Sequence, residues 1–85
     1  MEIIVPHVSL KHFPAQVDEP TKERLSKGLT DAVVAALDCD PSVVSIAMEP
    51  IPQEEWDARV YEPEIVGKRE LLIRRPGYGS LNEAD

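Results

Sequence analysis

Apolar and polar residues alternate from Pro6 to Lys11, in a segment that opens on a proline and ends at Phe13. Val8 and Leu10 are apolar, whereas the residues on either side of each are polar. A period of two is typical of a strand that packs one face and leaves the other polar. Because proline has no backbone N–H to donate to a sheet, Pro6 fits at the start of such a strand. We therefore predict a strand that begins at Pro6.

The apolar period changes to that of a helix between residues 19 and 37. Asp18, Glu19 and Pro20 suit a helix start, because acidic groups favour the first turn and proline loses no hydrogen bond there. Steps of one, three and four residues then place one apolar stripe on the helix: Leu25, Leu29, Ala32, Val33, Ala36 and Leu37. The segment 38–41 ends the helix at a proline.

A second strand is predicted from Ser42 to Met48, since this run is apolar at most positions and Pro50 prevents its continuation. Strand, helix and strand form a βαβ unit with parallel pairing. We then expect one helical turn over residues 53–57, a second helix from Glu62 to Arg75, and a flexible tail over residues 80–85. The apolar side of the second helix would consist of Ile65, Val66, Leu72 and Ile73.

The expected fold class is α+β, a βαβ unit followed by a second short helix. Two strands form a sheet that is only marginally stable alone, and both of its edges would be open. A second copy that extends the sheet to four strands, with helices on one face, removes both problems. We therefore expect a homodimer.

Composition narrows the class of protein. The chain has 85 residues, enough for one domain, and a net charge of −7, which disfavours nucleic acid and anionic membranes as partners. It has no apolar run near the ~20 residues of a membrane span. Cys39 is the only cysteine, so cytoplasm is the expected compartment.

Few side chains offer chemistry, and each also has a structural explanation. His7 and His12 have no cysteine or carboxylate at metal-ligand spacing, so we expect no metal and treat both as surface residues. Cys39 lies between two aspartates, which disfavour a thiolate. Trp56 is equally suited to a core or interface plug and to a substrate wall. Arg59 is a candidate partner for a carboxylate.

Taken together, several segments resemble the tautomerase superfamily: Pro6–Lys11, the helix ending at Leu37, Ser42–Ile46, Trp56, and Arg74–Tyr78. The resemblance is to the small 4-oxalocrotonate tautomerase group, and within it to the short dimeric branch with phenylpyruvate-enol tautomerase activity. It covers residues 6–79, leaving residues 1–5 as an N-terminal extension. It implies a βαβ fold that dimerises into a four-stranded sheet, with no cofactor.

The resemblance also implies a mechanism and exposes a departure. In that family the proline is the first residue, and its secondary amine is the general base that moves a proton between an enol oxygen and carbon. Pro6 is the matching position, but an internal proline is a tertiary amide without a basic nitrogen. Two explanations remain open. Either translation starts at Val5, if its codon is GTG, and residues 1–4 are a start-site artefact, or the extension is real, lengthens the strand and covers the site.

Further positions bear on the substrate. Two arginines that hold a dicarboxylate in hexameric relatives are matched here by Gln16 and Val44. A more apolar site, with Trp56 as wall and Arg59 or Lys11 meeting one carboxylate, suits the enol of a 2-oxo acid. We therefore expect an isomerase, provided that Pro6 is N-terminal. One alternative is a non-catalytic dimeric scaffold or small-ligand binder, in which residues 1–5 block the proline. The other is a regulatory partner that uses its acidic face.

Overall fold

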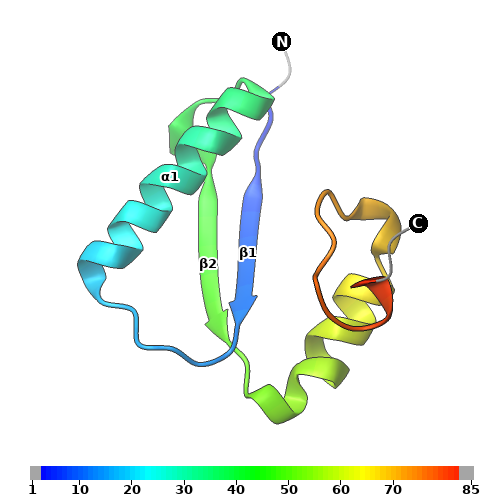
Figure 1. The fold of residues 1–85 in the computed structure, drawn as a ribbon. Coiled ribbons are helices and arrows are strands. Elements are labelled where there is room, and N and C mark those ends of the chain that lie inside the picture. The colour runs from blue at the N-terminus through cyan, green and yellow to red at the C-terminus, as the bar shows by residue number, and fades with distance from the viewer. Residues whose placement is uncertain (1–2, 83–85) are drawn as a thin grey trace. The chain divides into compact units, whose positions relative to one another are not determined.

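The computed structural model describes residues 3–82, in which the chain forms two compact units divided after Pro50. The first unit contains strand β1 (His7–His12), helix α1 (Glu19–Leu37) and strand β2 (Ser45–Pro50) (Figure 1). The two strands pair in parallel, from His7 opposite Ser45 to His12 opposite Pro50. The predicted βαβ unit is therefore confirmed.

Helix α1 is fixed at both ends by aspartates. Asp18 has an extended backbone and its side chain accepts the N–H of Thr21 at 2.9 Å, which satisfies one of the donors left open in the first turn. Asp38 adopts the left-handed conformation with φ 54°, and its N–H donates to Val34 O at 2.8 Å. This conformation is tolerated by aspartate and closes the helix one residue after Leu37.

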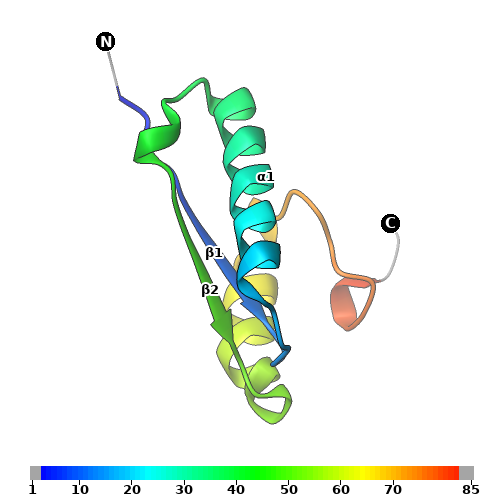
Figure 2. The same cartoon turned by 90° about the vertical axis from the view of Figure 1, so that its left-hand side faces the viewer.

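Helix α1 covers one face of the two-stranded sheet (Figures 1 and 2). The helix residues Leu25, Leu29 and Val33 are half-buried, as are the alternate strand residues Val8, Leu10, Ile46 and Met48. On the other face the side chains of His7, Ser9, Ser45 and Ala47 are exposed. The prediction that the first strand packs one face and leaves the other polar is thus confirmed.

The second strand begins three residues later than predicted. Pro41–Val43 form a 3₁₀ turn, in which Asp40 accepts the N–H of Ser42 at 2.8 Å. Proline at the first position and a capping aspartate before it favour this turn over an extended chain. The strand then starts at Ser45 and ends at Pro50.

The second unit differs from the predicted helix over Glu62–Arg75. A 3₁₀ turn over Gln53–Glu55 is followed by a π-helix over Asp57–Val66, and Leu72 and Ile73 lie beyond it. The expected single turn is confirmed, but the expected helix was wrong at both ends.

Proline explains the unusual helix. Pro63 lies inside it and can neither donate a hydrogen bond nor accommodate a carbonyl four residues earlier in a regular α-helix. The wider turn ends where the Gly67 N–H donates to Glu62 O at 2.8 Å. A Cβ at Gly67 would lie 2.7 Å from Pro63 O, so this close ending requires glycine.

Full burial is rare in the described chain. Among residues 3–81, the buried hydrophobic residues are Ile51, Val60 and Tyr61, all in the second unit.

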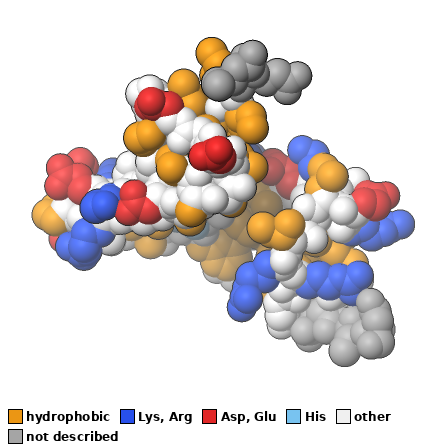
Figure 3. Space-filling model, turned by 90° about the horizontal axis from the view of Figure 1, so that it is seen from above, with side chains coloured by type: hydrophobic (Ala, Val, Ile, Leu, Met, Phe, Trp, Pro, Cys, Tyr) orange, Lys and Arg blue, Asp and Glu red, His pale blue; other side chains and the backbone are white. Residues whose placement is uncertain are grey.

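Two short 3₁₀ turns follow the π-helix, at Arg69–Leu71 and Ser80–Asn82. The expected flexible tail thus includes one short turn, and its residues 83–85 lie outside the described chain. Figure 3 shows hydrophobic side chains at the surface among acidic and basic ones.

Candidate active site

Pro6 lies directly before β1, at the end of the sheet where both strands begin (Figure 1). Its carbonyl oxygen accepts a hydrogen bond from the backbone N–H of Ser45 at 3.3 Å. Pro6 is half-buried, and this bond continues the ladder between the strands by one residue. The sheet therefore fixes the backbone of Pro6 even though the residue is outside the strand.

Ser45 also contacts the residue that follows Pro6. Its hydroxyl Oγ lies 2.7 Å from Nδ1 of His7, its direct partner in the strand register. Both side chains are on the exposed face of the sheet, away from α1. One serine thus contacts two consecutive residues at the start of β1.

The residues before Pro6 do not extend the strand. Ile3 and Val5 are 78% and 68% exposed, and residues 3–5 are not paired with β2. The expectation that a real extension would lengthen the strand was therefore wrong. Joined to Val5, the nitrogen of Pro6 is an amide and has no basic electron pair.

Lys11 is on the same polar face as His7, but at the other end of β1. It lies five positions after Pro6, which corresponds to about 16 Å along a strand. Its ammonium donates to Ser9 Oγ at 3.2 Å. Within one chain, Lys11 therefore does not meet the carboxylate of a small substrate held at Pro6.

Trp56 belongs to a cluster of aromatic residues in the second unit. Its Nε1 donates to the hydroxyl of Tyr78 at 3.1 Å, and the ring of Tyr78 lies 5.6 Å from that of Tyr61. The Tyr61 hydroxyl lies 3.1 Å from Ser80 Oγ and accepts the N–H of Leu81 at 3.3 Å. Trp56 is half-buried and thus contributes to holding its own unit together.

Arg59 is one turn further along and already has an anionic partner. Its guanidinium donates to a carboxylate oxygen of Glu55 at 2.9 Å, and both side chains are about half exposed. A substrate carboxylate at Arg59 must therefore compete with Glu55. The spacing of four residues is a signal that the sequence already contained.

Gln16 and Val44, the positions expected to match two arginines of hexameric relatives, offer no positive charge. Gln16 lines an open hollow of about 540 Å³ with Val17, Asp18 and Thr21. Hydrogen bonds from the side chain and backbone of Thr21 hold the pKa of Asp18 below its usual value, so this hollow contains a carboxylate. Val44 is half-buried and closes the 3₁₀ turn before β2.

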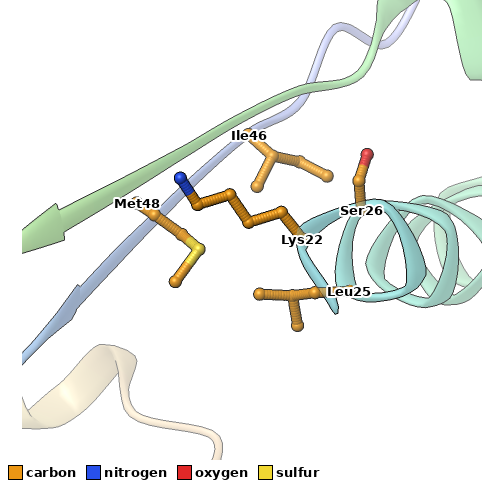
Figure 4. A pocket seen from close by; sticks show the side chains of 5 residues that line it. All are labelled: Lys22, Leu25, Ser26, Ile46 and Met48. Carbon is orange, nitrogen blue, oxygen red and sulfur yellow. The ribbon is translucent and has the colours of Figure 1, made fainter. Parts of the chain in front are cut away.

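A smaller hollow of about 250 Å³ lies between α1 and β2. Figure 4 shows Lys22, Leu25 and Ser26 reaching from the helix towards Ile46 and Met48 on the strand. Pockets that enclose small ligands usually measure about 300–1,000 Å³. Its polar side chains are those of Lys22, which lies 3.6 Å from a carboxylate oxygen of Glu19, and Ser26.

Other functional groups are sparse in the described chain. Within residues 3–82, no three His, Cys, Asp or Glu side chains are grouped to hold a metal ion. Cys39 is half-buried and not part of a disulfide. No helix in the same range is long and apolar enough to cross a bilayer.

Comparison with known proteins places this chain in a family. It is 38% identical over 78 residues to the Tautomerase PptA of Escherichia coli strain K12, covering 92% of this chain and 99% of that relative. The Tautomerase PptA of strain SE11 is 38% identical over 74 residues, covering 87% and 97%. No family model matches the chain. On this likeness, and with a parallel βαβ unit that starts after a proline, the chain belongs to the tautomerase superfamily, in its 4-oxalocrotonate tautomerase-like group.

Sequence reasoning missed two residues that contact residues described above: Ser45, which contacts His7, and Glu55, which pairs with Arg59. Glu55 was detectable from its four-residue spacing to Arg59. Ser45 was not, because its contact with His7 depends on the register of two strands joined by a helix.

Proposed function

We propose that the protein is a keto–enol tautomerase acting on a 2-oxo acid, with Pro6 as general base when it is the first residue. The observation that supports this most directly is the position of Pro6, held by Ser45 at the start of β1 in a member of the tautomerase superfamily. The residue is half-buried, as a base with a lowered pKa requires.

The chemistry needs one proton carrier. The amine of an N-terminal proline removes the enol O–H proton, which leaves an enolate, and then delivers a proton to the neighbouring carbon to form the ketone. A free α-amine has a pKa of about 8, and partial burial lowers this pKa towards the pH at which a base works best. No cofactor is required, because the transfer needs only a base and a place for negative charge.

A monocarboxylate is the substrate class that we favour. Gln16 and Val44 supply no cation for a second carboxylate, and an unpaired buried carboxylate is costly. We propose Trp56 as a wall for an aryl or alkyl group. Arg59 remains the candidate for the carboxylate from the second unit, after displacement from Glu55, and Lys11 remains a candidate only from a second chain.

We also propose a homodimer in a cytoplasmic setting. The first unit leaves both edges of a two-stranded sheet without a strand partner within residues 3–50. The acidic charge and single cysteine are consistent with that compartment.

The test compares two forms of the chain. One is the 85-residue form, and the other starts Met-Pro6, with removal of methionine confirmed by intact mass. We expect the short form to convert phenylenolpyruvate to the ketone about 10²- to 10⁴-fold faster, because an amide becomes a secondary amine at a positioned site. Unfolding curves of both forms should be similar, since residues 3–5 are exposed.

Variants of the short form identify the base. Pro6→Ala leaves a primary amine and should reduce activity without abolishing it, whereas acetylation of the N-terminus should abolish it. Equal activity of the long and short forms would exclude Pro6 as base. Inactivity of both forms, with ligand still bound, would favour the non-catalytic binder.

A further inference from the structure

We propose that His7 orients the substrate beside Pro6 by donating a hydrogen bond from Nε2 to its carboxylate, and that Ser45 positions the imidazole for this contact. The inference rests on the proposed tautomerase function. It assigns a carboxylate partner within the first unit, next to the proposed base.

The imidazole of His7 is held on one side only. Its Nδ1 lies 2.7 Å from Ser45 Oγ, and Ser45 is itself anchored because its N–H donates to Pro6 O at 3.3 Å. Within residues 3–82 no hydrogen bond to Nε2 is present, and the side chain of His7 is exposed. This atom is therefore accessible to a ligand.

The contact with Ser45 is compatible with a donor at Nε2. If the serine hydroxyl donates to Nδ1, the neutral ring carries its proton on Nε2. If the ring is protonated, both nitrogens carry protons and Nδ1 donates to Oγ. Only a neutral ring protonated at Nδ1 leaves Nε2 as an acceptor. Two of the three arrangements thus present an N–H, which suits a carboxylate oxygen.

The location matches the size of a 2-oxo acid. Pro6 and His7 are consecutive, so their Cα atoms are about 3.8 Å apart. In the substrate, the carboxylate carbon is two bonds from the carbon that gains the proton. The other polar candidates are less suitable within one chain, because Lys11 is about 16 Å along the strand and Arg59 is paired with Glu55.

His12 provides a matched control. It is the other histidine of the chain and also belongs to β1, but at its far end. Its Nδ1 lies 2.6 Å from the backbone oxygen of Phe13, not from a side chain next to Pro6. A histidine-to-phenylalanine change at this position therefore reports the general cost of losing an imidazole from the strand.

The experiment measures binding separately from turnover. In the chain that starts at Pro6, dissociation constants are measured by NMR titration for 3-phenylpropanoate and for its neutral counterpart, 3-phenylpropan-1-ol. The variants are His7→Phe, His7→Gln, Ser45→Ala and His12→Phe, each checked for folding by its NMR spectrum. Turnover of phenylenolpyruvate is measured in parallel.

We expect His7→Phe to weaken binding of the carboxylate roughly 10- to 100-fold, the usual effect of losing a hydrogen bond to a charged group. Binding of the alcohol should change little. His7→Gln keeps an N–H near the position of Nε2 and should restore part of the affinity. Ser45→Ala should have a smaller effect of the same kind, and His12→Phe should have none.

Failure of this inference differs from failure of the proposed function. If the proline-initiated chain turns over the enol but His7→Phe binds both ligands as well as the parent does, His7 is not the carboxylate partner and the tautomerase proposal stands. An equal loss for acid and alcohol would also overturn the inference, because it indicates a structural role. If the parent chain neither binds the acid nor turns over the enol, both proposals fail.

Discussion

Asp18 and Asp40 each decide where a helical segment begins. Their side chains accept backbone N–H groups from Thr21 and Ser42, respectively. These bonds favour the ionised carboxylate, so contacts from Thr21 lower the pKa of Asp18, and the backbone and side chain of Ser42 lower that of Asp40. Asp18 was recognised from the sequence as a helix start. Asp40 was assigned to the end of the preceding helix and not to the start of a new turn.

The lowered pKa of Asp18 predicts a specific dependence of stability on pH. Since the folded-state pKa is below the unfolded one, ionised Asp18 contributes stability above the unfolded value near 3.8, and this is lost as pH falls through the lower folded value. Asn also caps helices but does not titrate. We therefore expect the melting temperature of the parent, relative to Asp18→Asn, to fall as pH is lowered from 5 to below 3.

Thermal unfolding followed by circular dichroism checks this expectation. Glu23→Gln, at an exposed position of α1, controls for the loss of one acidic group. Parallel curves for the parent and Asp18→Asn across this range would show that the cap does not contribute to acid sensitivity.

At the scale of elements, α1 and the π-helix differ in how far the sequence determined them. In α1, the helical spacing of apolar residues and the capping residue Asp18 are local signals, and together they were sufficient to predict the helix. In the second unit, the contacts of Tyr61 reach Tyr78, Ser80 and Leu81, some twenty residues away. Local periodicity does not contain such contacts, and Pro63 further hid the helix by requiring an irregular turn. For the same reason the contact of Ser45 with His7 needed the strand register.

Gly79 provides a test of these distant contacts. Its φ is +74°, and a Cβ there would collide with the Tyr61 hydroxyl. We expect Gly79→Ala to destabilise the protein by about 1–3 kcal/mol, from backbone strain and displacement of Tyr61. Gly77→Ala is the control, because a Cβ at Gly77 has no atom within 4 Å.

Urea unfolding, followed by the fluorescence of Trp56 in the same unit, measures both variants. Similar unfolding free energies for the two variants would mean that the hydrogen bonds of Tyr61 with Ser80 and Leu81 do not stabilise the second unit.

At the scale of the whole molecule, the first unit lacks a fully buried side chain within residues 3–50. Helix α1 shields one face of the sheet, yet Val8, Leu10, Ile46 and Met48 are only half-buried beneath it. A sheet of two strands is marginal by itself. The shortage of buried surface, which was predictable because the chain has only two strands and one long helix, therefore supports pairing with a second copy. It does not specify which strand edge the second copy uses.

The direction of the backbone N–H groups distinguishes the edges. Ser45 donates to Pro6 across the sheet, so in a parallel pair the amides of the alternate β2 residues Ile46 and Met48 point away from β1. By the same alternation, the amides of His7 and Ser9 point away from β2. Sharing the sheet through β2 should thus protect Ile46 and Met48 from hydrogen exchange, and sharing through β1 should protect His7 and Ser9.

We predict a dimer by light scattering at micromolar concentration, with slow exchange at one of these two pairs of amides and fast exchange at the other. Dilution should lower the melting temperature, because dimerisation stabilises the folded chain by mass action. A dimer in which both pairs exchange fast would be assembled without extending the sheet. A folded monomer whose melting temperature does not depend on concentration would end the proposal of a shared sheet, because two strands and one helix would then be sufficient for stability.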